Sequence, residues 1–218
     1  LKKKWPPRSI KRHNHLPDTK KIAAIDPKIP DLKIIEKAGK IIRQNGVVIF
    51  PAKCLYGVAV NAFRSAALKR VFGLKQRDQS NPLLILIKNK TMLSGLVTSI
   101  PGTAQKLMKE FWPGNLTLVF QAQDHLPGLL TACTSKIGIR IPNQPVAKAL
   151  VENCNIPITG TSANISGQNS CFDVATLATD IIEKSDLILD AGPLKGGIGS
   201  TVVDITCKPA RILRQGEV

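Results

Sequence analysis

Short apolar runs, each bounded by helical patterns or by turn residues, constrain the fold of this chain more than any other feature. Ile22–Ile25, Val47–Phe50 and Leu83–Ile87 are too short to be core helices, and their composition favours buried strands. Between the first two runs, residues 31–45 carry apolar side chains at helical spacing. A strand, a helix and a strand in this order predict an α/β protein built on a layered sheet.

The remainder of the chain continues this alternation, without a repeat of fixed period. We expect strands at Leu116–Phe120, Ile137–Ile141, Ile156–Thr159, Leu187–Asp190 and Ser200–Ile205, and helices at Ser65–Leu74, Thr103–Phe111, Pro145–Glu152 and Val174–Lys184. Residues 1–18 are basic, have no apolar period and read as a flexible arm. No linker-like segment divides residues 19–218, so we expect one domain after the arm.

Positive charge is the strongest compositional signal. The chain has 31 basic and 15 acidic residues, and residues 1–21 hold eight of the basic residues and one Asp. Such an arm would favour contact with polyanions, including tRNA or double-stranded RNA. The apolar runs are too short to cross a bilayer and the first residues are charged, so we expect a cytoplasmic protein that does not enter membranes.

The sequence gives little reason to expect a metal site. The five cysteines are odd in number and form no C-x-x-C pair, so neither a disulfide framework nor a zinc site is indicated. His13 and His15 form an H-x-H pair, but no third ligand is near them in the sequence. We therefore predict no metal site made by protein side chains.

Lys75 and Arg77 follow a helical pattern and precede the Leu83–Ile87 run. Two cations at such a junction can point into one concavity that suits a triphosphate or a carboxylate. The alternative is a solvated, charged end of a helix. The pair alone leaves both interpretations open.

Three further stretches carry candidate ligand-binding groups. Cys54 and Tyr56 follow the Val47–Phe50 strand, although Tyr56 could equally be half-buried with its hydroxyl satisfied locally. Arg140 is a cation among apolar residues, where an unpaired charge is costly, so we favour an anionic partner. The Gly160–Gly167 stretch can present hydroxyls and amides to a phosphate, or can be a turn with local hydrogen bonds only.

Taken together, several ordered motifs resemble the YrdC-like threonylcarbamoyl-AMP synthases. The motifs are KQR with NPL near Lys75, WPGN-LTLVF, IGIRIP, TSANISG, STVVD and RILRQG. The resemblance implies an open, twisted, mostly mixed β-sheet flanked by helices, with a large concave cleft. It also implies a nucleotidyltransferase that joins L-threonine, bicarbonate and ATP into threonylcarbamoyl-adenylate and pyrophosphate, the first step toward the t6A modification at position 37 of tRNA.

The resemblance also assigns roles to residues. It implies that ATP is bound by five residues: Arg77, Asn81, Ser162, Asn164 and Arg214. Lys75 and Arg77 would act on the phosphates during catalysis, and threonine would contact Cys54, Tyr56, Arg140 and Ser200. Mg²⁺ is expected on the triphosphate, held mostly by water and phosphate oxygens. A threonylcarbamoyl transferase that modifies tRNA is the expected partner.

One loop departs from the family pattern. The family usually reads Pro-Thr-acid-Thr-x-Tyr-Gly after the second strand, whereas this chain reads PAKCLYG at Pro51–Gly57, and Leu86 stands where many members have a histidine. These changes fall where threonine is expected. A divergent nucleotide-binding or RNA-binding accessory protein, with altered or lost threonine specificity, is therefore the alternative function.

Overall fold

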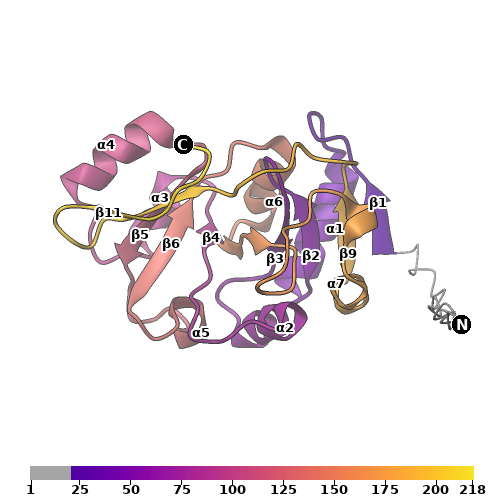
Figure 1. Cartoon of the computed structure of the whole chain (residues 1–218), viewed down its shortest axis with the longest axis horizontal. Coiled ribbons are helices and arrows are strands. Elements are labelled where there is room, and N and C mark those ends of the chain that lie inside the picture. Colours follow the sequence, from indigo (N-terminus) through magenta and orange to yellow (C-terminus); the bar gives the residue numbers. More distant parts are fainter. Residues whose placement is uncertain (1–20) are drawn as a thin grey trace, which may run out of the picture.

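The computed structural model describes residues 21–218, which fold into two mixed β-sheets with helices packed against them (Figure 1). The predicted α/β class with mixed strand pairing and flanking helices is confirmed, and the strands divide between two sheets. The basic arm at residues 1–18 and the His13–His15 pair lie outside the described residues.

The first sheet has five strands in the order β1-β9-β2-β3-β8. Their bounds are β1 Ile22–Ala24, β9 Leu187–Asp190, β2 Val48–Pro51, β3 Tyr56–Ala59 and β8 Thr161–Ser162. The pairs that β9 makes with β1 and β2 are parallel, whereas β3 is antiparallel to both β2 and β8. β2 and β3 form a hairpin, so the loop between them is held at both ends by strand pairing.

Alternation along β2 explains how this sheet is covered on both faces. Val48 and Phe50 pack in one cluster with α1 (Leu32–Arg43) and α6 (Pro145–Cys154), whereas Val47 and Ile49 pack in the other cluster with α2 (Ser65–Lys75). Successive side chains of a strand point to opposite faces. A continuous apolar run is therefore what a strand between two helical layers needs.

The second sheet has six strands in the order β11-β10-β5-β6-β4-β7. Their bounds are β11 Arg211–Arg214, β10 Thr201–Asp204, β5 Leu116–Gln121, β6 Lys136–Arg140, β4 Ile85–Leu86 and β7 Ile158–Thr159. The helices α3 (Lys90–Ser94), α4 (Gly102–Phe111) and α5 (Gly128–Thr131) lie on the same side of the molecule as this sheet (Figure 1).

Alternation along β5 gives the second sheet one buried face and one open face. Leu116, Leu118 and Phe120 are buried in the cluster that contains Met108 of α4. Thr117 and Val119, on the other face of the strand, line a cavity. The sheet thus places a core on one side and a ligand-accessible surface on the other.

One of the crossings between the two sheets takes a single residue. β7 belongs to the second sheet and β8 to the first, and Gly160 alone separates them. Its amide donates to the carbonyl of Leu84, at 3.0 Å. A Cβ at this position would lie 2.9 Å from the Cγ atom of Leu86, so the close approach requires glycine.

Several elements differ from the sequence predictions. The strands β3, β8 and β11 were not predicted, and the expected Leu83–Ile87 strand pairs only over β4. The expected helix at Val174–Lys184 is a 3-10 helix, Val174–Thr176, followed by α7, Thr179–Lys184. Leu177 and Ala178 between them are extended, which interrupts the helix while Leu177 is buried.

The helices can be compared with the length and hydropathy of a membrane span. None of those between residues 21 and 218 is both long enough and apolar enough to span a bilayer.

We predict that Gly57→Ala lowers the free energy of unfolding by about 1–3 kcal/mol, because its Cβ would lie 2.9 Å from two ring atoms of Phe50 in the core. Gly73→Ala is the matched control, since a Cβ there has no atom within 4 Å and Gly73 lies within α2. The control should raise the free energy of unfolding by about 0.5–1 kcal/mol. Urea unfolding measures both, and equal effects would contradict the packing described here.

Candidate functional site

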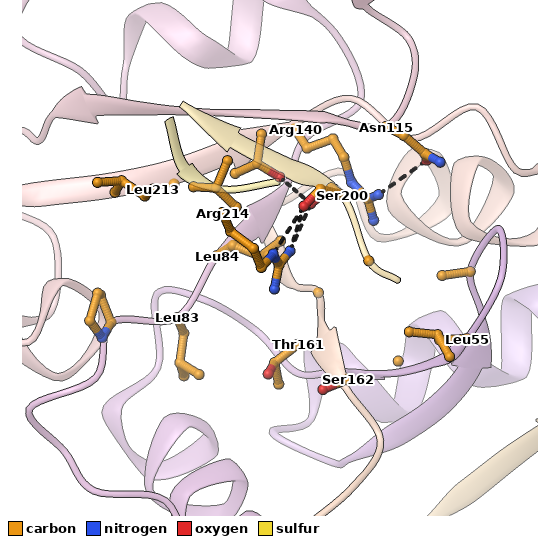
Figure 2. A pocket seen from close by; sticks show the side chains of 18 of the residues that line it. Leu55, Leu83, Leu84, Asn115, Arg140, Thr161, Ser162, Ser200, Leu213 and Arg214 are labelled. Atoms are coloured by element: carbon orange, nitrogen blue, oxygen red, sulfur yellow. Dashed lines mark hydrogen bonds between the residues drawn. The ribbon is translucent and has the colours of Figure 1, made fainter. Parts of the chain in front are cut away.

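A cleft of about 470 Å³ is lined by residues from both sheets. The second sheet contributes β5, β6 and β10, and the facing wall comes from the Ala52–Gly57 loop, residues 82–84 and Gly160–Ser162. Figure 2 shows Arg140, Ser200 and Arg214 across the cleft from Ser162. The described residues that line it include five cations and one acid: Lys53, Arg77, Lys136, Arg140, Arg214 and Asp204. This balance suits an anionic ligand.

Arg140 is the most deeply buried of these cations, at 8% exposure. Its Nη1 lies 3.5 Å from Oδ1 of Asn115, a long hydrogen bond, and its Nε has no partner among the described residues. Burial, and then repulsion by Arg214, lowers the pKa of Arg140 to about 10. A buried guanidinium with an unused donor on a ligand-accessible wall is suited to bind an anion.

Arg214 is held against Ser200. Its Nε and Nη2 donate to the Ser200 carbonyl at 3.0 and 2.8 Å, and Nη2 also lies 3.2 Å from the Ser200 hydroxyl. That hydroxyl is 2.8 Å from Oγ1 of Thr117 on β5. Burial lowers the pKa of Arg214. The structure therefore brings together three of the residues predicted for ligand binding, Arg140, Ser200 and Arg214, on one wall.

Lys75 is buried, at 1% exposure, and it is not among the residues that line the cleft. Its ammonium donates to the Ser162 carbonyl, to the Asn164 carbonyl at 2.7 Å and to Asn164 Oδ1 at 3.2 Å. Burial, and then the charge of Arg77, lowers the pKa of Lys75 to about 8. We expected the Lys75 side chain to point into the cleft. It instead stabilises the turn that follows β8.

Asn164 is committed to the same turn. Its Nδ2 donates to the carbonyls of Ile165 and Gln168 at 2.9 and 2.7 Å, and its Oδ1 accepts from the Ser162 hydroxyl and from Lys75. Ser162 lines the cleft, whereas Asn164 does not. In this structure Asn164 shapes the turn that presents Ser162.

Arg77 faces the cleft although Lys75 does not, because α2 ends between them. Gln76 adopts a left-handed conformation, with φ of 48°, which turns the chain out of the helix. The Arg77 guanidinium donates to the carbonyls of Asn81 and Pro82, at 3.3 and 3.1 Å. Burial lowers the pKa of Arg77. Asn81 itself is exposed and contributes its backbone carbonyl to this arrangement, not its side chain.

The Tyr56 hydroxyl is satisfied within the protein, but by residues far away in the sequence, and the side chain is fully buried, whereas the second interpretation of the sequence had it half-buried with a local partner. It donates to the Gly192 carbonyl at 2.7 Å and accepts from the Ala191 amide at 2.9 Å, and Oδ1 of Asp190 lies 3.3 Å away. Burial is the main cause of a strongly raised pKa of Tyr56. Tyr56 forms part of the wall, but its hydroxyl is not free for a ligand.

Cys54 belongs to a group of polar side chains that includes Glu217 and Asn115, two residues that were not candidates from the sequence. Its thiol donates to Oε1 of Glu217 at 2.9 Å, and Oε2 of Glu217 accepts from Nδ2 of Asn115 at 2.8 Å. Lys53 completes the group, with its Nζ 3.4 Å from Glu217 Oε2. Burial, and then the hydrogen bond to Glu217, raises the pKa of Cys54 to about 11.

A family profile described as telomere recombination, of the Sua5–YciO–YrdC proteins, matches residues 40–216. Among curated proteins, the threonylcarbamoyl-AMP synthase of Pyrococcus abyssi is 37% identical over 195 residues. That alignment covers 89% of this chain and 57% of the relative. A putative threonylcarbamoyl-AMP synthase of Mycobacterium tuberculosis is 33% identical, with 88% of each protein covered.

Solved structures give the same picture. Pyrococcus abyssi Sua5 complexed with L-threonine superposes with a TM-score of 0.85 at 36% identity, covering 89% of this chain and 57% of the other. Escherichia coli YciO superposes with a TM-score of 0.81 at 26% identity, covering 89% and 95%. The chain thus spans little more than half of the Pyrococcus abyssi protein and nearly all of YciO.

We predict that Lys75→Met lowers the free energy of unfolding by about 1–3 kcal/mol, because the oxygens of Ser162 and Asn164 lose a buried donor. Lys69→Met, on an exposed position of α2, is the control and should change stability by less than about 0.5 kcal/mol. Urea unfolding at pH 7 measures both. If the two variants were equally stable, Lys75 would not hold the turn.

We also predict slow alkylation of Cys54. With a pKa of about 11, against an ordinary 9.0, its thiol forms roughly 100-fold less thiolate at pH 8. The exposed thiols of Cys133 and Cys207 serve as internal controls in the same sample. Iodoacetamide labelling resolved by peptide mass spectrometry should find Cys54 modified last of these three. Modification of Cys54 at the rate of Cys133 would contradict the burial and the hydrogen bond.

Proposed function

The chain belongs to the Sua5–YciO–YrdC family, and from that premise we propose that it is a threonylcarbamoyl-AMP synthase. The reaction joins L-threonine, bicarbonate and ATP into threonylcarbamoyl-adenylate and pyrophosphate. The observation that supports it best is the cationic cleft, in which the buried Arg140 keeps a donor without a partner among the described residues. A reaction that assembles a triphosphate, a carboxylate and a bicarbonate-derived anion needs such a surplus of cations.

For the nucleotide, we assign Arg77, Ser162 and Arg214 as the groups that contact it directly. All three line the cleft, and two of them carry a permanent charge. Lys75, Asn81 and Asn164 act through their neighbours: Lys75 and Asn164 hold the turn that carries Ser162, and the Asn81 carbonyl holds Arg77. This division refines the expectation that five of these residues bind ATP and that Lys75 acts on its phosphates.

For threonine, we assign Arg140 and Ser200 as the groups that receive the carboxylate. Cys54 lies on the facing wall, and Tyr56 shapes that wall with its ring while its hydroxyl stays bound to Gly192. Pyrococcus abyssi Sua5 has been solved with L-threonine, and this chain shares its fold. The PAKCLYG loop therefore keeps a wall in place, although it lacks the two threonine hydroxyls of the family pattern.

Catalysis by positioning fits the groups that are present. In the adenylation step, an oxygen of the threonine carbamate forms a bond to the α-phosphorus, and the bond from that phosphorus to the leaving pyrophosphate breaks. Arg77 and Arg214 would offset the charge that spreads over the phosphate oxygens. No histidine is among the described residues that line the cleft, so we assign no general base there.

Magnesium belongs to this proposal as a companion of the triphosphate, where it would neutralise phosphate charge. Between residues 21 and 218 no group of three or more His, Cys, Asp or Glu side chains is placed to hold a metal ion. The single acid of the cleft lining, Asp204, is 3.0 Å from Lys136. These residues suit an ion held mostly by water and phosphate.

The partners follow from the product. Threonylcarbamoyl-adenylate is a reactive mixed anhydride, so a transferase that passes the threonylcarbamoyl group to position 37 of tRNA is the proposed acceptor. A cytoplasmic location, the expectation from the sequence, is proposed with it.

A second candidate function is RNA binding by an accessory protein, favoured by the eight basic residues within residues 1–21. It requires tRNA affinity that falls steeply with salt and weakens when residues 1–21 are deleted. Binding that is indifferent to salt and to the arm would contradict it.

We predict that the protein converts ATP to an AMP-linked product and pyrophosphate, and that this conversion depends on threonine and bicarbonate. We also predict that Arg77→Ala weakens ATP binding by about 10- to 100-fold. The reason is the loss of a charged donor in the cleft, worth roughly 1.5–3 kcal/mol. Arg64→Ala, an exposed position just before α2, is the control and should keep ATP affinity. Product analysis by mass spectrometry and calorimetric ATP titration measure these outcomes. If purified protein with magnesium made no adenylate, the proposal would fall.

A further inference from the structure

The strand β11 forms a free edge of the second sheet. It is the outermost strand in the order of that sheet, and its neighbour on the inner side is β10. Apart from this pairing, its backbone makes no hydrogen bond to another backbone group within residues 21–218. Figure 1 shows β11 at the outer side of the molecule, with β5 and β6 further inside. An edge strand presents unpaired amides and carbonyls, to which a further strand can add.

The side chains of β11 are open to solvent. All four residues are exposed, and the two aliphatic ones, Ile212 and Leu213, are 58% and 54% exposed. Arg211 and Arg214 flank them. Arg214 is held by the carbonyl of Ser200, whereas Arg211 makes no ion pair within the described part of the chain. The edge thus combines an aliphatic surface with a cation that is available to a partner.

A groove of about 340 Å³ lies at the start of the same strand. Lys208, Pro209 and Ala210, from the loop that leads into β11, line one side of it. Ser99 and Thr103, next to the start of α4, also line it. None of the described residues that line the groove is acidic. An extended chain that pairs with β11 can therefore place a further side chain in a second open and positively charged surface.

Charge selects the kind of strand that can add to this edge. Residues 205–216 contain three cations, Lys208, Arg211 and Arg214, and no acid. A second copy of this chain is disfavoured, because antiparallel pairing of β11 with itself about a twofold axis places Arg211 opposite Arg214, and like charges directly opposite are destabilising. RNA fits less well than a peptide, since Phe120, the aromatic residue of the groove lining, is 1% exposed and offers no ring for base stacking.

We propose that the free edge of β11 is a docking site for an acidic, extended segment of another protein, which adds to the second sheet as a further strand. Backbone pairing with β11 supplies affinity in this mode of recognition, and side chains supply selectivity. Carboxylates of the segment would lie over Arg211 and Lys208, and an apolar side chain would contact Ile212. This docking is independent of the chemistry proposed for the cleft.

The probe is a blocked, fluorescein-labelled hexapeptide, Thr-Glu-Val-Val-Glu-Thr, whose core is complementary to the RILR sequence of β11 in either strand direction. Fluorescence anisotropy should show that it binds the unaltered protein. Arg211→Glu should weaken this binding by about tenfold, because attraction between exposed charges becomes repulsion. The same variant should strengthen binding of Thr-Lys-Val-Val-Lys-Thr to a similar extent. Lys37→Glu, at an exposed position of α1, is the control and should leave both affinities unchanged.

Strand pairing is tested separately from charge. Methylation of both valine amides of the probe removes two successive N–H groups, which point to opposite sides of a strand. The methylated peptide therefore cannot pair fully along either edge, although it keeps both carboxylates. It should bind about tenfold more weakly, since the hydrogen bonds to β11 are lost. Binding with an unchanged affinity would mean that charge alone holds the peptide, and strand addition would be wrong.

Each other outcome also overturns the proposal. If the hexapeptide did not bind the unaltered protein, or if Lys37→Glu weakened it as much as Arg211→Glu, β11 would not be the site. If a short uridine oligonucleotide bound in a manner that Arg211→Glu abolished, while the peptide did not bind, the surface would belong to nucleic acid. A dimer in sedimentation equilibrium that Arg211→Glu altered would mean that a second copy occupies the edge. Thermal unfolding verifies that both variants are folded.

Discussion

The ammonium of Lys75 is the buried charge on which the geometry of the site depends. A lysine at 1% exposure is costly to bury unless its hydrogen-bonding capacity is used, and here three oxygens of Ser162 and Asn164 accept from it. The contact joins the end of α2 to the turn after β8, two segments about 90 residues apart in the chain. It therefore fixes the position of Ser162 on one wall, and the left-handed Gln76 that follows Lys75 sets the direction of Arg77.

The wall opposite Ser162 carries Arg140 and Arg214, and the cleft lining has only one acid, Asp204, among its described residues. Burial lowers the pKa of both Arg140 and Arg214, and the charge of Arg214 lowers that of Arg140 further. Such an arrangement is unfavourable for the empty protein and favourable for a complex with anions, because the ligand supplies the missing charge. The donors are already held in place by Ser200 and Asn115, so little reorganisation is needed when a ligand arrives.

The sequence predicted most of the long elements, because their signal lies in local patterns. The apolar runs that became β2 and β5, and the helical spacing of α1, α4 and α6, carry their signal within a few residues. β8 and β11 are short and have no apolar alternation that marks them, so their pairing depends on partners elsewhere in the chain. The interrupted helix before α7 was missed because Leu177 is buried by tertiary packing that no local pattern reveals.

The direction of polar side chains was the least predictable feature. Lys75 and Arg77 differ by two positions, yet one is buried in a turn and the other lines the cleft. Glu217 carried no signal at all, since Cys54 and Asn115 are 163 and 102 residues away in the sequence. The motifs behind the resemblance pointed to Arg140, Ser200 and Arg214, and the fold gathers these three residues on one wall.

The single residue that separates β7 from β8 has a mechanical consequence. The Gly160 amide donates to the Leu84 carbonyl, and only Thr161 separates Gly160 from Ser162, so a strand of the second sheet passes into the cleft lining of the first within a few residues. The position of the Ser162 hydroxyl in the cleft is therefore tied, through a connection of one residue, to β7 at the edge of the other sheet.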